Sequence, residues 1–191
     1  MFAGFVGVSM DQIFNQMAKF RYMFGGRMRC PAVVRLAMGA GMNMGAQHSQ
    51  TIYPFLTAVP GLKVAVPSNA HDAKGLLLSA IRDPDPVIYL EHKFLYRRLR
   101  EEVPDGDFTV PIGKARVARE GTDVTVLTYA AMLQVAQEAA TTAALEGISV
   151  EVVDLRTLLP LDEDAILASA MKTGKVLVLH GPNLNLLGER E

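Results

Sequence analysis

The sequence predicts an α/β fold in which helices cover the faces of a largely parallel sheet. Short apolar runs typical of buried strands alternate with segments of helical periodicity, and half of the 191 residues are hydrophobic while 20% are charged. The charged stretch 96–111, with two prolines around a glycine, interrupts this alternation. We therefore expect two α/β units, at 1–98 and 115–180, joined by a linker at 99–114.

The first unit is expected to begin with a helix over residues 9–24. Ser9 can cap this helix, apolar side chains repeat within it at helical spacing, and the pair Gly25-Gly26 ends it. Asn69 is the expected N-cap of a second helix over 70–81. Buried strands are predicted at 32–36, 63–66 and 87–90.

The second unit repeats the pattern of strands and helices. An alanine-rich segment over 131–145 predicts a helix that stops at Gly147, and Asp162 can cap another helix that runs to Met171. Strands are predicted here at 124–128, 149–154 and 175–180. Consecutive strands separated by helices are expected to pair in parallel, because a helical crossover returns the chain to the end of the sheet where the previous strand began.

Charge and cysteine content exclude several classes of function. The formal net charge of -1 gives no electrostatic reason to expect nucleic acid or an anionic membrane as a partner. The single cysteine, Cys30, excludes an internal disulfide and a metal site built on cysteines. No stretch reaches the roughly 18 apolar residues of a membrane helix, and residues 1–10 lack the basic flank of a signal peptide. We expect a cytoplasmic protein.

The glycine-rich loop over residues 37–50 is the clearest candidate site. It ends in Gln47-His48-Ser49-Gln50, and a histidine flanked by amide and hydroxyl side chains can shuttle protons or orient a substrate. The same pattern suits an ordinary surface histidine, because no nucleophile or metal ligand accompanies it. The loop glycines at positions 39, 41 and 45 do not have the spacing of the dinucleotide-binding fingerprint.

Two further features carry chemical alternatives. The turn Asp83-Pro84-Asp85-Pro86 could hold a hard cation through its oxygens, or it could simply connect a helix to a strand. Phe5, with Phe2 close by, could stack on a planar ligand, or it could pack in the core. The residues by themselves leave both alternatives open.

Several motifs, read together and in order, point to one family. They are MAKFRYMFGG at 17–26, QHSQ at 47–50, PGLKV at 60–64, DAKGL at 72–76, AIRD at 80–83, PIGKA at 111–115, DLRT at 154–157 and KTGK at 172–175. With these motifs the chain resembles, over about residues 1–180, the beta subunit of the decarboxylating component of 2-oxoacid dehydrogenase complexes, including the acetoin branch. The resemblance implies a partial transketolase-like pyrimidine-binding domain followed by a partial transketolase C-terminal-like domain.

The resemblance also implies roles for particular residues. Phe5 matches the aromatic residue that stacks on the aminopyrimidine ring of thiamine diphosphate. His48 matches the active-site histidine that moves protons and passes the acyl group to lipoamide. Five positions match those that bind a structural potassium ion in some members, several through backbone oxygens. They are Ala32, Ala80, Ile81, Asp83 and Asp85.

The implied activity needs partners. In this family the beta subunit supplies the pyrimidine half of the thiamine diphosphate site, while an alpha subunit supplies the diphosphate half and holds Mg²⁺. Alpha and beta subunits form a heterotetramer, which transfers the acyl group to a lipoyl-bearing acyltransferase. The chemistry is oxidative decarboxylation of pyruvate or a related 2-oxoacid, or cleavage of acetoin.

The chain departs from the family pattern at both ends. The family's glutamate that promotes the active tautomer of the cofactor lies upstream of the Phe5 region, and the first glutamate here is Glu91. We therefore expect the chain to be inactive by itself. The last segment, GPNLNLLGERE at 181–191, resembles the start of type II 3-dehydroquinate dehydratase, and Asn183 and Arg190 match active-site positions of that family.

These observations give three functional hypotheses. The first is a fragment of a thiamine-diphosphate-dependent oxidoreductase subunit. The second is a non-catalytic module that binds an alpha or beta partner. The third is the dehydroquinase activity suggested by the tail, although eleven residues cannot build that site.

Overall fold

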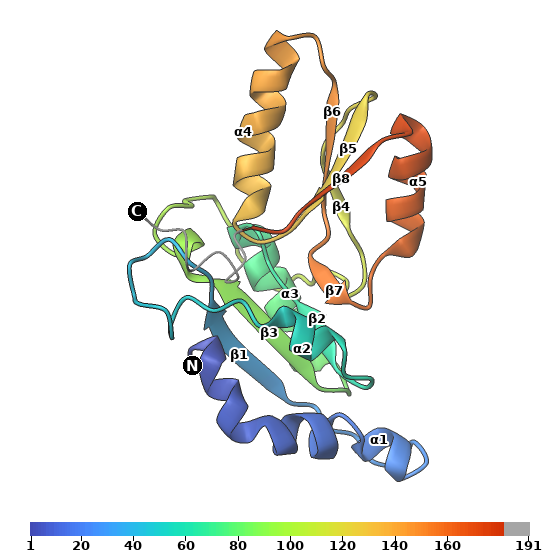
Figure 1. Ribbon diagram of the computed structural model, residues 1–191. Helices are drawn as coiled ribbons and strands as arrows, with labels where there is room; N and C mark the ends of the chain where they lie inside the picture. Colours follow the sequence, from blue (N-terminus) through green and yellow to red (C-terminus); the bar gives the residue numbers. More distant parts are fainter. Residues whose placement is uncertain (182–191) are drawn as a thin grey trace.

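A computed structural model describes residues 1–181 and arranges them around two sheets (Figure 1). Each sheet has four strands, in the orders β1-β3-β2-β7 and β4-β6-β5-β8. We call them sheet A and sheet B. Sheet A lies in the lower part of Figure 1 and sheet B in the upper part, so the predicted α/β class is confirmed.

Sheet A combines a parallel core with one antiparallel edge strand. Its strands are β1 (Val33–Met38), β3 (Val87–His92), β2 (Lys63–Ala65) and β7 (Thr157–Leu159). β1 and β2 flank β3 in parallel, and Val87 lies opposite both Val33 and Lys63. The first four residues of β3 are fully buried, which fits the continuous apolar run of a central parallel strand.

Sheet B is built in the same way. Its strands are β4 (Arg116–Arg119), β6 (Val150–Asp154), β5 (Val124–Thr128) and β8 (Val176–Leu179). β5 pairs in parallel with both β6 and β8, and β4 adds an antiparallel edge. The predicted strand over 124–128 agrees with β5, and the strands at 149–154 and 175–180 agree with β6 and β8 to within a residue at each end.

The N-terminal helical region begins earlier than predicted and is irregular. It consists of a 3₁₀ helix, η1 (Ala3–Ser9), a π-helix, η2 (Gln12–Met17), and a short α-helix, α1 (Phe20–Met23). Ser9 is therefore not an N-cap, because its hydroxyl bonds back to the carbonyl of Val6. Two glycines and two valines within η1 weaken the preference for regular α-helix. Gly25 and Gly26, both at positive φ, end the region as predicted.

The remaining helices lie beside the sheets. They are α2 (Tyr53–Thr57), α3 (Ala70–Arg82), η3 (Lys93–Leu95), α4 (Met132–Leu145) and α5 (Glu163–Thr173). The predicted caps of two of them are confirmed. The side chain of Asn69 accepts a hydrogen bond from the amide of Asp72, and that of Asp162 accepts one from the amide of Ala165.

The two sheets share one core, because β7 leaves the second half of the chain to pair with β2 of the first half. The largest group of mutually packed buried side chains includes Leu36 and Val64 from sheet A and Leu127 and Val153 from sheet B. Residues 99–114 contain no helix or strand, and within them Val110 packs on Gly75 of α3.

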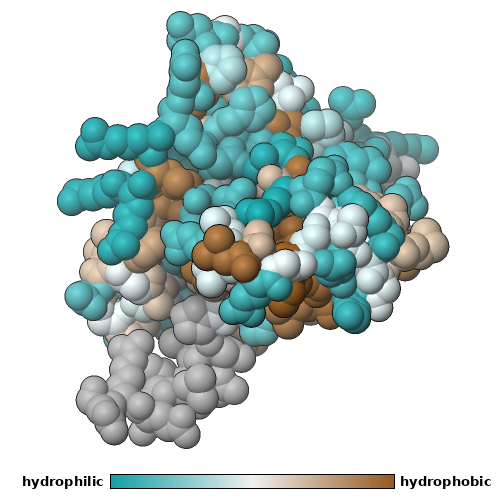
Figure 2. All heavy atoms as spheres, turned by 90° about the horizontal axis from the view of Figure 1, so that it is seen from above, coloured by the Kyte–Doolittle hydropathy of each residue, from teal (hydrophilic) through white to brown (hydrophobic). Residues whose placement is uncertain are grey.

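The surface shown in Figure 2, viewed from the upper side of Figure 1, is mostly polar, with separate small apolar areas. Within residues 1–181, no helix has the length and apolar character that crossing a membrane requires.

Candidate active site

The candidate active site lies at the carboxyl end of sheet A, where ligands bind in open α/β sheets. The parallel strands β1 and β3 both end there, at Met38 and His92. The chain turns away from β1 at Gly39, whose φ is +94° and where an added Cβ would lie 2.2 Å from Nε2 of His92. Glycine satisfies both demands, so the loop 39–52 can pass close to the end of β3.

The loop brings His48 against the N-terminal aromatic residues. The imidazole stacks on the ring of Phe2, with centroids 4.1 Å apart and planes inclined by 14°. The ring of Phe5 lies 6.5 Å from the imidazole at 23°. The backbone of Phe2 pairs with Ala37 of β1, which fixes this end of the chain beside the loop. The two residues singled out in the sequence, Phe5 and His48, are therefore neighbours.

Exposure suits these two residues for contact with a ligand. Phe5 is 51% exposed, so the alternative that it packs in the core is wrong. His48 is partly buried, and its Nδ1 is shielded from solvent without a hydrogen-bond partner among the described residues. A buried polar atom left without a partner is costly, and functional sites are where such atoms are retained. A planar ligand with polar edges fits beside an exposed aromatic ring and this imidazole.

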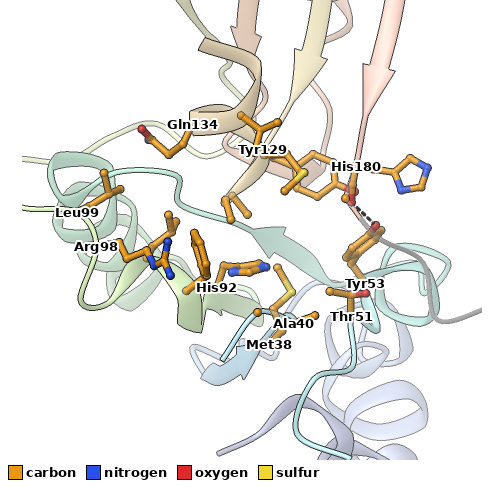
Figure 3. A pocket seen from close by; sticks show the side chains of 18 of the residues that line it. Met38, Ala40, Thr51, Tyr53, His92, Arg98, Leu99, Tyr129, Gln134 and His180 are labelled. Carbon is orange, nitrogen blue, oxygen red and sulfur yellow. Dashed lines mark hydrogen bonds between the residues drawn. The ribbon is translucent and has the colours of Figure 1, made fainter. Parts of the chain in front are cut away.

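A cavity of about 520 Å³ lies beside the site, between the carboxyl ends of the two sheets. Figure 3 shows its lining, in which Tyr53 and His92 come from the first half of the chain and Tyr129 and His180 from the second. The hydroxyl of Tyr53 donates to the carbonyl of His180 at 3.3 Å, and the rings of Tyr53 and Tyr129 meet edge to face. Clefts of this size between domains, with mostly apolar walls and a few polar groups, are typical of ligand sites.

His92 stays neutral at the floor of this cavity. Burial, with a smaller contribution from the charge of Lys93, lowers its pKa to about 4. Its Nδ1 also has no hydrogen-bond partner within residues 1–181. A neutral imidazole can donate with one nitrogen and accept with the other.

The acidic turn lies on another part of sheet A and already holds two protein cations. Nζ of Lys63 lies 2.6 Å from Oδ1 of Asp83 and 3.4 Å from Oδ2 of Asp85, and Nη1 of Arg21 lies 2.7 Å from Oδ1 of Asp85. Although burial raises it, the hydrogen bond from Arg21 and the charge of Lys63 hold the pKa of Asp85 below its usual value. These carboxylates are therefore paired within the protein.

The other residues matched to a potassium site surround the same turn. The carbonyl of Ala32 accepts the amide of Val87 at 3.0 Å, and the carbonyl of Ala80 accepts the amide of Asp83 at 3.3 Å. Ile81 lies in the last turn of α3. Among residues 1–181, no three histidine, cysteine or acidic side chains are grouped to hold a metal ion. A cation here would have to use backbone oxygens, because the carboxylates face Lys63 and Arg21.

A buried charge cluster joins the two halves of the chain. Nε and Nη2 of Arg156 donate to Oδ2 and Oδ1 of Asp72 at 2.7 and 2.8 Å, and Asp72 is 1% exposed. Although burial raises it, hydrogen bonds from Arg156, Asn69 and His71 hold the pKa of Asp72 below its usual value.

Asp154 belongs to the same charge cluster. It accepts a hydrogen bond from Ser68, and burial raises its pKa to about 6.

Sequence reasoning missed the residues that form the cavity and the end of β3. Tyr53, Tyr129 and Lys93 carried no motif by themselves. The available signal was positional, because carboxyl ends of parallel strands carry function. Tyr129 directly follows the strand predicted at 124–128, and His92-Lys93 lies one residue beyond the strand predicted at 87–90. The tail matches Asn183 and Arg190 lie outside the described residues.

Each half of the chain matches a known domain family. Residues 1–98 match the model of the transketolase pyrimidine-binding domain, and residues 113–185 match that of the transketolase C-terminal domain. Among solved structures, a split-gene transketolase described as an inactive beta4 tetramer superimposes with a TM-score of 0.76 at 27% identity. The match covers 94% of this chain and 55% of that one.

Curated relatives are more similar in sequence. The chain is 55% identical over 179 residues to the acetoin:2,6-dichlorophenolindophenol oxidoreductase subunit beta of Cupriavidus necator, covering 94% of this chain and 53% of the relative. It is 48% identical over 178 residues to the pyruvate dehydrogenase E1 component subunit beta of Bacillus subtilis, covering 93% of this chain and 55% of the relative. The chain thus spans about half the length of these relatives.

Proposed function

This chain belongs to the transketolase pyrimidine-binding family, and we propose that it is part of the beta subunit of a thiamine-diphosphate-dependent dehydrogenase. Its substrate is pyruvate, a related 2-oxoacid or acetoin. The observation that carries the proposal is the pairing of an exposed Phe5 ring with the imidazole of His48 at the carboxyl end of sheet A. The acetoin- and pyruvate-type relatives, at 48–55% identity, support this class of reaction.

Each site residue has a distinct role in this proposal. Phe5 stacks on the aminopyrimidine ring of the cofactor, which supplies the carbanion chemistry when it is bound. His48 holds and moves a proton at its imidazole and assists transfer of the acyl group to lipoamide. The loop 39–52, which leaves β1 at the close contact between Gly39 and His92, keeps the imidazole beside the aromatic rings.

The proposal includes partners and ions. An alpha subunit supplies the diphosphate half of the site and holds Mg²⁺, a second beta subunit completes a heterotetramer, and a lipoyl-bearing acyltransferase receives the acyl group. Backbone oxygens of Ala32, Ala80 and Ile81 hold a structural K⁺ beside the paired Asp83 and Asp85. Replacing NaCl with KCl at constant ionic strength is expected to raise the melting temperature of the protein. Equal melting curves in the two salts would contradict the potassium site.

Calorimetric titration of thiamine diphosphate with Mg²⁺ tests the main proposal, in the presence and absence of an acetoin-type alpha subunit. Binding and turnover are expected with the alpha subunit. Phe5→Ala is expected to weaken cofactor binding roughly threefold to tenfold, the worth of one aromatic contact. Phe24→Ala is the matched control, because Phe24 is similarly exposed (48%) but lies at the far end of the N-terminal helical region.

His48→Ala is expected to leave cofactor affinity unchanged and to lower turnover by roughly 10²–10⁴. His71→Ala is its control, since His71 also stacks on a phenylalanine, with ring centroids 4.6 Å apart, but lies outside the site. Binding of the alpha subunit without cofactor binding or turnover would overturn the enzymatic proposal and favour a non-catalytic partner-binding module.

A further inference from the structure

Lys93 is a buried cation at the end of β3. Among residues 1–181 it is the one lysine in the core, with 4% of its surface exposed. No carboxylate oxygen of the described residues lies within 4.0 Å of its Nζ. Burying an ammonium without an anionic partner is costly, and burial lowers the pKa of Lys93. The buried ammonium of Lys93 therefore does not stabilise the fold through an ion pair, and its other contacts must explain its position.

The ammonium makes its contacts to the candidate active site. It donates a hydrogen bond to the main-chain carbonyl of His48. It also lies 5.1 Å from the centroid of the Phe2 ring, within the range of a cation–π interaction. Phe2 in turn stacks on the imidazole of His48 at 4.1 Å. Lys93 thus holds both the backbone of His48 and the ring against which the imidazole rests.

The position of Lys93 in the chain explains why it can do this. His92, the last residue of β3, directs its imidazole at Gly39 and lines the cavity in Figure 3. Lys93, the next residue, contacts the loop further along, at His48. The end of β3 therefore touches the loop 39–52 at its start and again near its end. This arrangement makes the strand a rigid support for a loop that has no strand or helix of its own.

We propose that Lys93 is a positioning residue for His48: its ammonium holds the His48 backbone and the Phe2 ring, and so fixes the plane of the imidazole. This inference deepens the proposed function and rests on it for the catalytic meaning of His48. The placement of the imidazole itself is a physical claim that can be tested without cofactor or substrate.

Lys93→Met, which keeps the length of the side chain and removes its charge, tests that placement in the isolated chain. Nuclear Overhauser contacts between the Phe2 and His48 rings are expected to be lost. Backbone amides of residues 46–50 are expected to exchange with solvent about tenfold faster, the worth of one hydrogen bond from a charged donor. Amides of β3 should keep their protection, which shows that the fold is intact. Lys93→Arg should restore most of the ring contacts, because it restores the cation and a donor.

Lys74→Met is the matched control. Nζ of Lys74 lies 5.0 Å from the Phe108 ring centroid and donates to the carbonyl of Pro104 at 2.6 Å, so it makes the same two kinds of contact away from His48. Its replacement should leave residues 46–50 unchanged. Unaltered Phe2–His48 contacts and unaltered exchange in Lys93→Met would overturn the proposal. If Lys93→Met does not fold, the neutral donor in Lys93→Gln gives the same test, with partial loss expected.

The assembled enzyme with an alpha subunit gives the second readout. Lys93→Met should lower kcat at least about tenfold and leave the Kd of thiamine diphosphate within about twofold, with partial rescue by Lys93→Arg. An equal loss in cofactor affinity would mean that Lys93 serves the fold, which overturns a positioning role. Failure of the wild-type chain to bind cofactor would instead sink the proposed function, while the ring contacts would still decide whether Lys93 holds His48.

Discussion

Replacing Arg156 with methionine is expected to leave the carboxylate of Asp72 buried without its main cation. Two hydrogen bonds of 2.7 and 2.8 Å would be lost, and Asp72 is 1% exposed, so water cannot take their place. Removing one partner of a buried pair costs about 3–5 kcal/mol. Nδ2 of Asn69, at 2.8 Å, and Nε of Arg116, at 3.9 Å, remain near the carboxylate.

These remaining contacts place the expected loss in free energy of unfolding at the lower end of that range, about 3 kcal/mol, or roughly 6–12 °C in melting temperature for a chain of this size. Arg82→Met is the matched control. Arg82 also makes two hydrogen bonds to a carboxylate, both 2.8 Å long, but its side chain and that of Asp107 are 51% and 65% exposed. Its replacement should cost less than about 1 kcal/mol.

Urea unfolding followed by far-ultraviolet circular dichroism measures both losses, since the chain has no tryptophan to report by fluorescence. The double variant Arg156→Met, Asp72→Asn should recover part of the loss, because the unpaired charge is then gone. Equal losses for Arg156→Met and Arg82→Met would refute the reasoning, since burial would then make no difference to the pair.

Three other outcomes are expected. Gly61→Ala should lower the free energy of unfolding by at least about 2 kcal/mol more than Gly45→Ala. Both glycines have positive φ, but only at Gly61 would the new Cβ meet a backbone atom, 1.9 Å from the carbonyl oxygen of Ala18. Equal unfolding free energies for the two variants would contradict this. Asp154 has its pKa raised from 3.8 to about 6. The folded chain therefore binds its proton more tightly, and this contribution to stability, about 3 kcal/mol, is present below pH 4 and lost as the pH rises through 6. Asp154→Asn should remove this dependence of the unfolding free energy on pH, and an unchanged dependence would show that Asp154 is not its source. His92 should titrate near pH 4 in an NMR experiment instead of near 6.5, so its own contribution is lost as the pH falls from 6.5 to 4; an imidazole that titrates near 6.5 would show that it is not buried.

Local patterns were enough to predict most of the fold. The apolar run Val124–Thr128 forms β5 with the expected bounds, and Asn69 and Asp162 cap the helices that they were expected to cap. β4 and β7 were missed because each is an edge strand of three or four residues that pairing alone defines. Such strands have no apolar run long enough to mark them in the sequence.

The site was predictable only in part. Phe5 and His48 lie 43 positions apart in sequence, and their proximity depends on the pairing of Phe2 with Ala37, which no local pattern encodes. The family resemblance supplied the two residues, whereas the sequence pattern alone favoured a place in the core for Phe5. The cavity lined by Tyr53 and Tyr129 forms only when the two halves meet, so no single segment could reveal it.

The antiparallel strand β7 has a consequence for how this molecule can be divided. Because Thr157–Leu159 completes the sheet that contains the candidate active site, a protease that nicks the exposed stretch near residue 105 would not release two self-sufficient pieces. A polypeptide ending there would leave one side of β2 with unsatisfied amides and carbonyls, an edge prone to pair with other chains. The two halves, which match two different domain families, are therefore better regarded as one folding unit.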